Sequence, residues 1–363
     1  MDALNVLALN SGSSSLKFGL YRVDSAGAET LLTQSVSTAQ DPHAINRIAA
    51  VLAASGMPRP DAVGHRIVHG GPSMRQHCRI DVMVLRQLQK AAVFAPLHTP
   101  ATLAVIQSMH AHFPGVPQVA CFDTQFHAGL PAAARVLPIP RELQSEGMQR
   151  YGFHGLSLES IVRQLGSAVP ERMVVAHLGN GASITAVKAG QSIDTSMGLT
   201  PSGGVIMGTR SGDLDPGVLL YLLREKKLDA AALAALIDHR SGLLGISGVS
   251  GDMRLLHEAA AANPDARLAI TMFCTAVGKQ IAAMITVLNG LDLLVFTGGI
   301  GENDAPVRAQ ICAGLAWLGV TLDASRNRLA SNPISAPASR CQVQVLAAQE
   351  DEQIARHAWA LLA

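Results

Sequence analysis

Three serines and a lysine fill the turn in "LNSGSSSLKF", where Ser13, Ser15 and Lys17 follow a strand-like apolar run. Small residues let successive backbone N–H groups converge on an anion, because no large side chain blocks a close approach. The hydroxyl groups add donors and the lysine adds a positive charge, so this turn favours phosphate binding. It is not the Walker pattern, since a strand and not a helix is expected after the lysine. A surface hairpin with a polar loop is the alternative.

A second segment, "HLGNGAS" around Asn180 and Gly181, has the same plan of apolar strand, tight turn and apolar strand. "FTGGIGEN" follows a strand and precedes a helix, so its backbone could approach a nucleotide closely, but a plain strand-to-helix turn explains it equally well. The repeated plan indicates one architecture used twice. Two such halves facing each other would form a cleft with one turn on each side.

Two arginines lie where they could meet a phosphoryl group: Arg66 in "GHRIVHGG" and Arg210 in "MGTRSGDLDPG". A guanidinium is a planar, bidentate donor that stabilises the spread negative charge of a phosphoryl group in transfer. Structural Arg–Asp pairs are the alternative, because Asp213 and Asp215 follow Arg210 closely. Asp123 ends a strand in "VACFD", where a carboxylate commonly reaches a ligand cleft as a base or a magnesium ligand. It could instead cap the next helix.

The histidines give weaker signals. His65 and His69 are four residues apart, which on a helix could ligate a metal. Their β-branched and glycine neighbours favour a strand, so both are expected on one face of a sheet and a metal site is disfavoured. His154 in "YGFHG" is either a functional group or a packed, hydrogen-bonded core histidine.

Composition limits the classes of protein. The 363 residues predict two domains, and 48% hydrophobic residues are enough for sizeable cores. A net charge of +1 without long charge runs excludes a general nucleic-acid binder. Five widely spaced cysteines indicate a reducing compartment, not a disulfide framework. No secretory leader and no apolar run of about 18 residues is visible, so a cytoplasmic protein without a membrane partner is expected.

Hydrophobic periodicity predicts alternating strands and helices. The expected strands lie at 6–10, 16–23, 31–37, 61–68, 117–122, 173–177, 183–188, 192–194 and 342–346, with one more before "GGIGEN". The expected helices lie at 44–54, 82–94, 101–112, 216–227, 230–238, 253–261, 265–289, 305–318 and from Glu350 to the end.

Ten segments, in order along nearly the whole chain, resemble the acetate kinase family, which shares a superfamily with sugar kinases, actin and heat-shock ATPases. They are "LNSGSSSLKF", "GHRIVHGG", "APLHTPA", "FDTQFH", "RYGFHG", "HLGNGAS", "DTSMGLTP", "MGTRSGDLDP", "SGLLGISGVSGDMR" and "GGIGEN". The resemblance implies an α/β fold of two domains with duplicated actin/ribonuclease-H-like topology flanking a nucleotide and substrate cleft. The expected division is 1–148 and 149–349, with the helix at about 350–363 returning to the first domain.

The resemblance also implies residue roles. The expected catalytic residues are Asp123, Arg66, Arg210 and His154, with His98 and His177 as neighbours. The residues expected to bind the acyl substrate are Arg66, Val68, Leu97, Phe153 and Pro201. Those expected to bind the nucleotide are Lys17, Ser13, Ser15, His177, Asn180, Gly181, Asp252, Arg254, Gly299, Ile300 and Gly301. Asn10 and Glu350 are the expected metal ligands.

The activity so implied is reversible, magnesium-dependent transfer of the ATP γ-phosphoryl group to acetate, in a homodimer, with manganese possible in place of magnesium. Four segments depart from the family pattern: Thr99 stands where an asparagine is common, "FHGLSLES" lacks the usual Thr-Ser-His after the glycine, "TPSGGVIMG" begins at Thr200, and "AAQEDEQIAR" surrounds Glu350. None removes a residue in a catalytic role, but they leave the acyl-chain preference open. A kinase for propionate or another short-chain acid is one alternative. A nucleotide-binding sensor of the same fold without transfer activity is the other.

Overall fold

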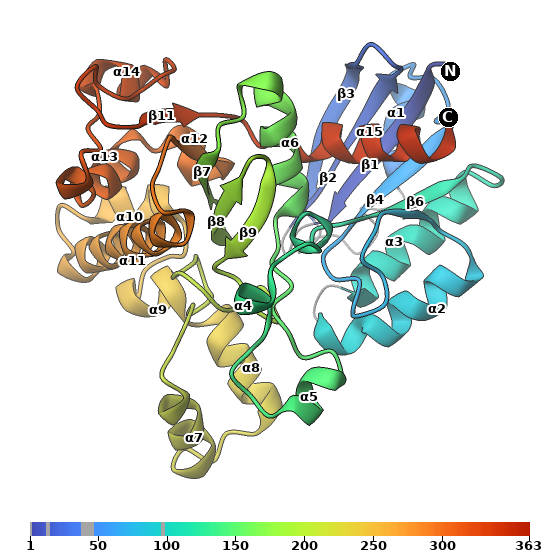
Figure 1. Cartoon of the computed structure of the whole chain (residues 1–363). Helices are drawn as coiled ribbons and strands as arrows, with labels where there is room; N and C mark the ends of the chain where they lie inside the picture. Colours follow the sequence, from blue (N-terminus) through green and yellow to red (C-terminus); the bar gives the residue numbers. More distant parts are fainter. Residues whose placement is uncertain (1, 12–14, 38–46, 96–98) are drawn as a thin grey trace. The chain divides into compact units, whose positions relative to one another are not determined.

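The computed structural model describes residues 2–11, 15–37, 47–95 and 99–363. The chain forms two compact units (Figure 1). The first consists of Met1–Ala128, His154–Ser160 and Gln349–Ala363, and the second of Gly129–Phe153 and Ile161–Ala348. The expected division after residue 148 differs from these units. Residues from Gly129 onward make their contacts within the second unit, and the segment His154–Ser160 belongs to the first.

The sheet of the first unit begins with three antiparallel strands, β1 (Leu4–Ser11), β2 (Ser15–Val23) and β3 (Ala28–Ser37). Two further strands, β4 (Ala62–Ile67) and β6 (Gln118–Phe122), lie parallel to β1 on its other side. The short β5 (Cys78–Arg79) pairs with β6, which gives the order β3-β2-β1-β4-β6-β5.

The second unit repeats this topology. An antiparallel meander of β7 (Arg172–Leu178), β8 (Ala182–Lys188) and β9 (Gln191–Thr195) is followed by β10 (Leu293–Thr297) and β11 (Gln342–Val345). These last two strands continue the sheet in parallel on the other side of β7, in the order β11-β10-β7-β8-β9. The prediction of one architecture used twice is therefore confirmed.

Period-two alternation decides which helices cover which face of the first sheet. Leu7 and Leu9 of β1 pack with residues of α1 (Arg47–Ala54) and α3 (Thr99–His112). Val6 and Ala8, on the opposite face, pack with Ile354 of α15 (Glu350–Leu362). Figure 1 shows α15 crossing this sheet. The first sheet thus packs against the N-terminal half of α15.

The second sheet is covered by α11 (Pro264–Leu288), which packs on β7, β8 and β9. Asn263 caps its first turn, and Asn289 ends it in the left-handed conformation. By length and composition α11 could also cross a membrane. Its contacts with a sheet and with neighbouring helices are those of a core helix.

The remaining helices are short. Those of the first unit and its continuation are α2 (Val82–Ala91), with the 3₁₀ turn Ala92–Phe94, the 3₁₀ turn Gln125–His127, and α6 (Gly155–Leu165). Those of the second unit are α4 (Ala132–Arg135), α5 (Arg141–Ser145), α7 (Pro216–Arg224), α8 (Ala230–His239), α9 (Gly242–Ser247), α10 (Met253–Ala259), α12 (Gly298–Asn303), α13 (Ala305–Ala313), α14 (Ala324–Leu329) and the 3₁₀ turns Gly166–Ala168 and Ala316–Leu318.

Every expected strand and helix is present, with ends that differ by a few residues. The expected helix at 44–54 is described only from Arg47, because residues 44–46 lie outside the described part. The elements that the sequence analysis missed are β5, α4, α5, α6, α9, α12 and α14. Of these α6 matters most, because it begins beside Asp123.

Candidate active site

Arg66 and Asp123 form a buried ion pair where β4 and β6 end. Arg66 donates from Nε and Nη2 to Oδ2 of Asp123 at 2.9 and 2.6 Å. The two strands are parallel and in register, with Arg66 opposite Cys121, so Asp123 follows directly after the end of β6. The structural Arg–Asp pair, which was the alternative to a phosphoryl-binding role, does form for Arg66. It also brings together two of the four expected catalytic side chains.

Asn10 extends this cluster toward α15. Its Oδ1 accepts a hydrogen bond from Nη1 of Arg66 at 3.0 Å. Its Nδ2 donates to Glu350 and to Asp351, both at 2.8 Å. The expected metal residues Asn10 and Glu350 are therefore neighbours, although 340 positions separate them in the chain.

Asp351 is a site residue that the sequence analysis missed. It shares the Asn10 amide with Glu350, and Lys17 contributes to its electrostatic environment. Burial raises the pKa of Asp351, the hydrogen bond from Asn10 opposes this, and Glu350 adds to it. The acidic run "EDE" at the start of α15 was the available signal. It resembles the ordinary acidic first turn of a helix, which made it uninformative.

The cluster has more negative than positive charge. Burial raises the pKa of Asp123 to about 6; Arg66 opposes this shift and Glu350 adds to it. Burial lowers the pKa of Arg66, but Asp123 and Glu350 outweigh that effect and raise it. The guanidinium of Arg66 lies near three carboxyl groups, those of Asp123, Glu350 and Asp351. This excess of negative charge favours the binding of a divalent cation.

Oδ1 of Asp123 is buried and has no hydrogen-bond partner among the residues that the structure describes. Since Arg66 binds the other oxygen, Oδ1 can accept from a ligand. An unpaired buried carboxylate oxygen is costly in a static fold and is typical of functional sites.

The turn that starts α6 is built against Asp123. The backbone N–H of Gly155 donates to the Asp123 carbonyl at 2.8 Å, and a Cβ on Gly155 would lie 2.3 Å from that oxygen. His154, just before it, is buried and has a φ of 60°, in the left-handed region that non-glycine residues rarely adopt. "FHG" is therefore required by close packing at the site, and it places His154 next to the backbone of Asp123.

His65 and His69 do not form a metal site together. His65 shares a 2.6 Å hydrogen bond with Gln118, and burial lowers its pKa to about 4. His69 lies beyond the end of β4, accepts from the Gly71 N–H at 2.8 Å and stacks on Phe94. Both are satisfied core histidines.

In the second unit, a glycine-rich region surrounds the β7–β8 turn. Gly179 donates to the Gly181 carbonyl at 2.9 Å, and Gly208 donates to the Asn180 carbonyl at 3.1 Å. Gly298 has a φ of 77° and lies against the backbone of Leu178 at the start of α12. The turn of Asn180 and Gly181 and the "GGIG" turn are therefore adjacent, as a nucleotide site built from both would require.

Arg210 lies beside Pro201 in the same unit. Its Nη1 donates to the Pro201 carbonyl at 3.1 Å. Asp213 and Asp215 accept hydrogen bonds from the backbone N–H groups of Gly204 and Gly217. The two aspartates thus shape their own loops, and Asp215 caps α7.

The other expected residues are placed as follows. Asp252 caps α10 and pairs with the exposed Arg254 at 2.6 Å, so these two side chains bind each other. Ser15 and Lys17 lie in β2, His177 near the end of β7, and Phe153 is buried in the second unit. Ser13, Leu97 and His98 lie outside the described residues.

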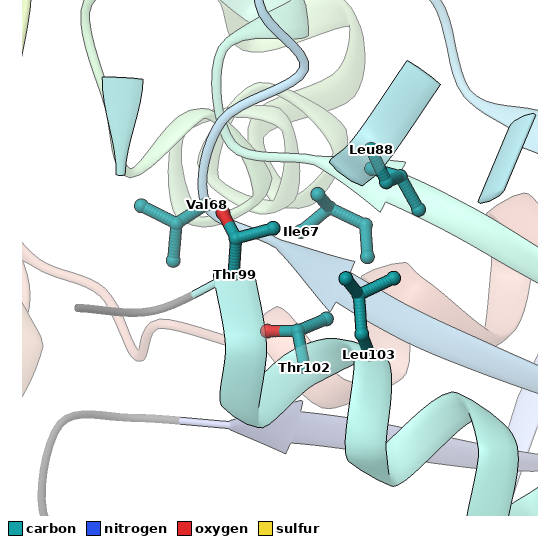
Figure 2. Close-up of a pocket in the computed structure, with 6 residues that line it drawn as sticks. All are labelled: Ile67, Val68, Leu88, Thr99, Thr102 and Leu103. Carbon is teal, nitrogen blue, oxygen red and sulfur yellow. The ribbon is translucent and has the colours of Figure 1, made fainter. Parts of the chain in front are cut away.

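Val68 lines a small cavity in the first unit, enclosed by Ile67, Leu88 and three residues of α3 (Figure 2). Its volume is about 10 Å³, room for a single water-sized group. Thr99, one of the departures from the family pattern, forms part of its wall. The cavity is too small for an acyl substrate, but it leaves space behind Val68.

Comparisons with known proteins identify the family of the chain. The model of the acetokinase family matches residues 24–356. The chain is 42% identical to an acetate kinase of Nitrobacter hamburgensis, over 99% of this chain and 96% of that protein. It is 39% identical to a propionate kinase of Citrobacter rodentium, over 97% of this chain and 95% of that protein.

Two solved structures are similar over nearly the whole chain. A propionate kinase from Francisella tularensis has a TM-score of 0.89 and 34% identity, covering 99% of this chain and 100% of that one. The Porphyromonas gingivalis acetate kinase has a TM-score of 0.85 and 34% identity, with the same coverage. These likenesses confirm the expected α/β fold class. With the family model and the full-length relatives, they show that the chain belongs to the acetokinase family.

Proposed function

We propose that this chain is an acetate kinase, which transfers the γ-phosphoryl group of ATP to acetate and runs in both directions. The observation that carries the proposal is the buried Arg66–Asp123 pair, extended by Asn10 to Glu350, in a member of the acetokinase family. The free Oδ1 of Asp123 gives the site an acceptor directed at a ligand.

The chemistry needs little from the protein beyond positioning and charge. The carboxylate of acetate is already a nucleophile, so no strong general base is required. Catalysis then depends on bringing two anions together and stabilising the phosphoryl group in transfer. In this proposal Arg66 and Arg210 bind the acetate carboxylate and the phosphoryl group. His154 donates a hydrogen bond to the equatorial oxygens of the phosphoryl group, and Asp123 orients the acetate that accepts this group.

The donor set near Asn10 fits a magnesium ion. Carboxylate and amide oxygens are the ligands that magnesium and manganese prefer, and Glu350 and Asp351 lie side by side on the same amide. Asn10 now points its nitrogen at these carboxylates and its oxygen at Arg66. To ligate a metal directly its amide would rotate, so Glu350 and Asp351 are the stronger candidates. A bound divalent ion would neutralise phosphate charge.

For the nucleotide, the proposal uses the two small-residue turns. Asn180, Gly181 and the "GGIG" turn supply backbone N–H groups in the second unit, and Lys17 supplies a cation in the first. The other residues proposed to bind the nucleotide are Ser13, Ser15, His177, Asp252, Arg254, Gly299, Ile300 and Gly301.

For the acyl group, the proposal uses Val68, Leu97, Phe153 and Pro201 as the apolar wall. A second candidate, a propionate kinase, is favoured by one observation. Relatives named as propionate kinases match this chain over nearly its full length. One methylene changes selectivity in an apolar pocket by only about 1–3 kcal/mol, so the two substrates must be compared directly.

The test is an acyl phosphate assay with purified protein, Mg-ATP and hydroxylamine, which converts acyl phosphates to hydroxamates. Acetate, propionate and butyrate are compared over a concentration series. The highest kcat/KM with acetate supports the proposal, and a higher value with propionate supports the second candidate. Nucleotide binding without product from any acid would contradict both and support a sensor without transfer activity.

A homodimer in the cytoplasm completes the proposal. Exposed apolar side chains on α7 support a subunit interface, since Leu220 and Tyr221 are 48% and 53% exposed. Four of the five cysteines are buried free thiols, which is compatible with a reducing compartment.

A further inference from the structure

A buried carboxylate in the first unit, Glu159 of α6, lies between two histidines that neither the reaction nor the family resemblance uses. Oε2 of Glu159 lies 2.7 Å from Nε2 of His357 and 3.4 Å from Nε2 of His77. The two imidazole rings are 4.0 Å apart between centroids. The side chains of Glu159 and His77 are only 14% and 4% exposed.

Two histidines and one glutamate could in principle bind a transition metal such as zinc. The bonding of His77 argues against this. Its Nδ1 accepts the backbone N–H of Phe122 at 3.0 Å, so the proton of the neutral ring is on Nε2. This Nε2 lies 3.4 Å from Oε2 of Glu159 and makes no hydrogen bond to the described residues. Histidines that ligate metals usually donate from the other ring nitrogen. The cluster is therefore held by the charge of Glu159 and by its hydrogen bond with His357.

Two members of the cluster lie on helices that also contact or carry an active-site residue, and His77 binds the strand that ends before Asp123. His77 binds the N–H of Phe122, the residue before Asp123. Glu159 is on α6, whose first residue, Gly155, binds the carbonyl of Asp123. His357 is on α15, two helical turns after Glu350 and therefore on the same side of that helix.

We propose that Glu159 is a positioning residue, which through His77 and His357 fixes Asp123 and the Glu350–Asp351 pair relative to one another. Burial raises the pKa of Glu159, but the hydrogen bond with His357 and the nearby His77 outweigh this effect and hold the pKa at about 2, so Glu159 keeps its charge at neutral pH. Its importance for turnover rests on the proposed function, whereas its effect on the structure does not.

The first measurement is hydrogen–deuterium exchange of the peptide that covers the start of α15, in wild type and in Glu159→Gln. Loss of the carboxylate leaves one histidine donor poorly paired, so the first turns of α15 exchange about tenfold faster or more, on the scale of lost supporting hydrogen bonds. Strand β10, in the second unit, serves as the internal reference and does not change. Glu352→Gln is the matched control, because it breaks the Glu352–Arg356 ion pair on the same helix without touching the cluster.

The second measurement separates positioning from simple stability. His357→Gln keeps a nitrogen donor near Glu159, and His357→Leu removes it. If Glu159 positions the site, His357→Leu and Glu159→Gln lower kcat and raise the half-saturating Mn²⁺ concentration about tenfold or more. His357→Gln recovers most of both losses, and KM for ATP changes little in any variant.

Unchanged exchange and unchanged Mn²⁺ binding in Glu159→Gln would overturn the proposal. So would one tightly bound Zn²⁺ per chain in dialysed wild type that Glu159→Gln loses, since that would make the cluster a metal site. Faster exchange in Glu159→Gln, together with a wild type that makes no acyl phosphate, would support the positioning role and contradict the proposed function instead.

Discussion

Nη2 of Arg66 lies 2.6 Å from Oδ2 of Asp123, while Oδ1 of the same carboxylate has no hydrogen-bond partner among the described residues. The guanidinium therefore fixes the direction of the carboxyl plane and leaves one oxygen for a ligand. This arrangement explains why a pair that looks purely structural can also belong to an active site.

Replacing Arg66 by alanine is expected to lower kcat/KM for acetyl phosphate formation by about 10²–10³-fold, the range seen when one charge-stabilising donor is removed. The loss has two causes, a missing donor for substrate and an unpaired Asp123. Arg59→Ala is the control, because Arg59 binds the Pro114 carbonyl at the surface, away from the cluster around Arg66. Near wild-type turnover in Arg66→Ala would exclude the assigned role.

Because its pKa is shifted, Asp123 makes the free energy of unfolding depend on pH, and the direction of the shift sets the direction of that dependence. Its folded pKa of about 6 lies above its usual value of 3.8, so between these pH values the folded chain holds a proton that the unfolded chain has lost. Its contribution to the free energy of unfolding therefore decreases as pH rises from about 4 to about 6. Chemical denaturation at several pH values should show this slope in wild type, and Asp123→Asn should abolish it. Turnover should fall below about pH 6, where Asp123 is protonated.

Glu159 makes the free energy of unfolding change with pH in the opposite direction, and does so at lower pH. Its folded pKa of about 2 lies below its usual value of 4.5, so its stabilising contribution is complete above about 4.5 and is lost as pH falls toward 2. Glu159→Gln should therefore show a weaker dependence of unfolding free energy on pH in this range. Identical acid curves for the two proteins would mean that the histidines do not bind this carboxylate.

Gly155→Ala tests the packing of the α6 turn on Asp123. The new Cβ would lie 2.3 Å from the Asp123 carbonyl oxygen, so the backbone must shift, at a cost of about 1–3 kcal/mol, typical of overpacking. Turnover should fall as well, since the shift moves Asp123. Gly129→Ala is the matched control, because a Cβ there meets no atom within 4 Å. Equal melting temperatures for the two variants would contradict this account.

Asp351→Asn should weaken metal binding, because Asp351 and Glu350 share the Asn10 amide. Removing one of the two carboxylates on the Asn10 amide should raise the half-saturating Mn²⁺ concentration by about tenfold or more. Electron paramagnetic resonance of free Mn²⁺ measures this without turnover. Glu352→Gln, one residue further on, should bind Mn²⁺ like wild type.

Much of the fold could be predicted because its strands are long, apolar and separated by small-residue turns. The two strand–turn–strand segments predicted the start of both sheets, and their common plan predicted a duplicated topology. Helix α6 was missed because His154 and Gly155 start it by close packing on Asp123, and neither is a usual helix cap.

The candidate site was predictable where a residue type is unusual in its place, as for Arg66 at the end of a strand and Asp123 after the next. Asp351 and the cluster of His77, Glu159 and His357 were not. Their roles arise from contacts between segments far apart in the chain, such as the 198 positions between Glu159 and His357. Periodicity describes only neighbours in sequence, so it cannot find such contacts.

The position of α15 also has a consequence for synthesis on the ribosome. Val6 and Ala8 are covered by a helix that begins 340 positions after Asn10. At about 5–20 residues per second, the ribosome needs on the order of 20–70 s to make that interval. During this time Ile354, Ala355 and Ala358, which α15 supplies to the cluster on that face, have not been made. The nascent chain therefore exposes apolar surface that is covered only when α15 emerges.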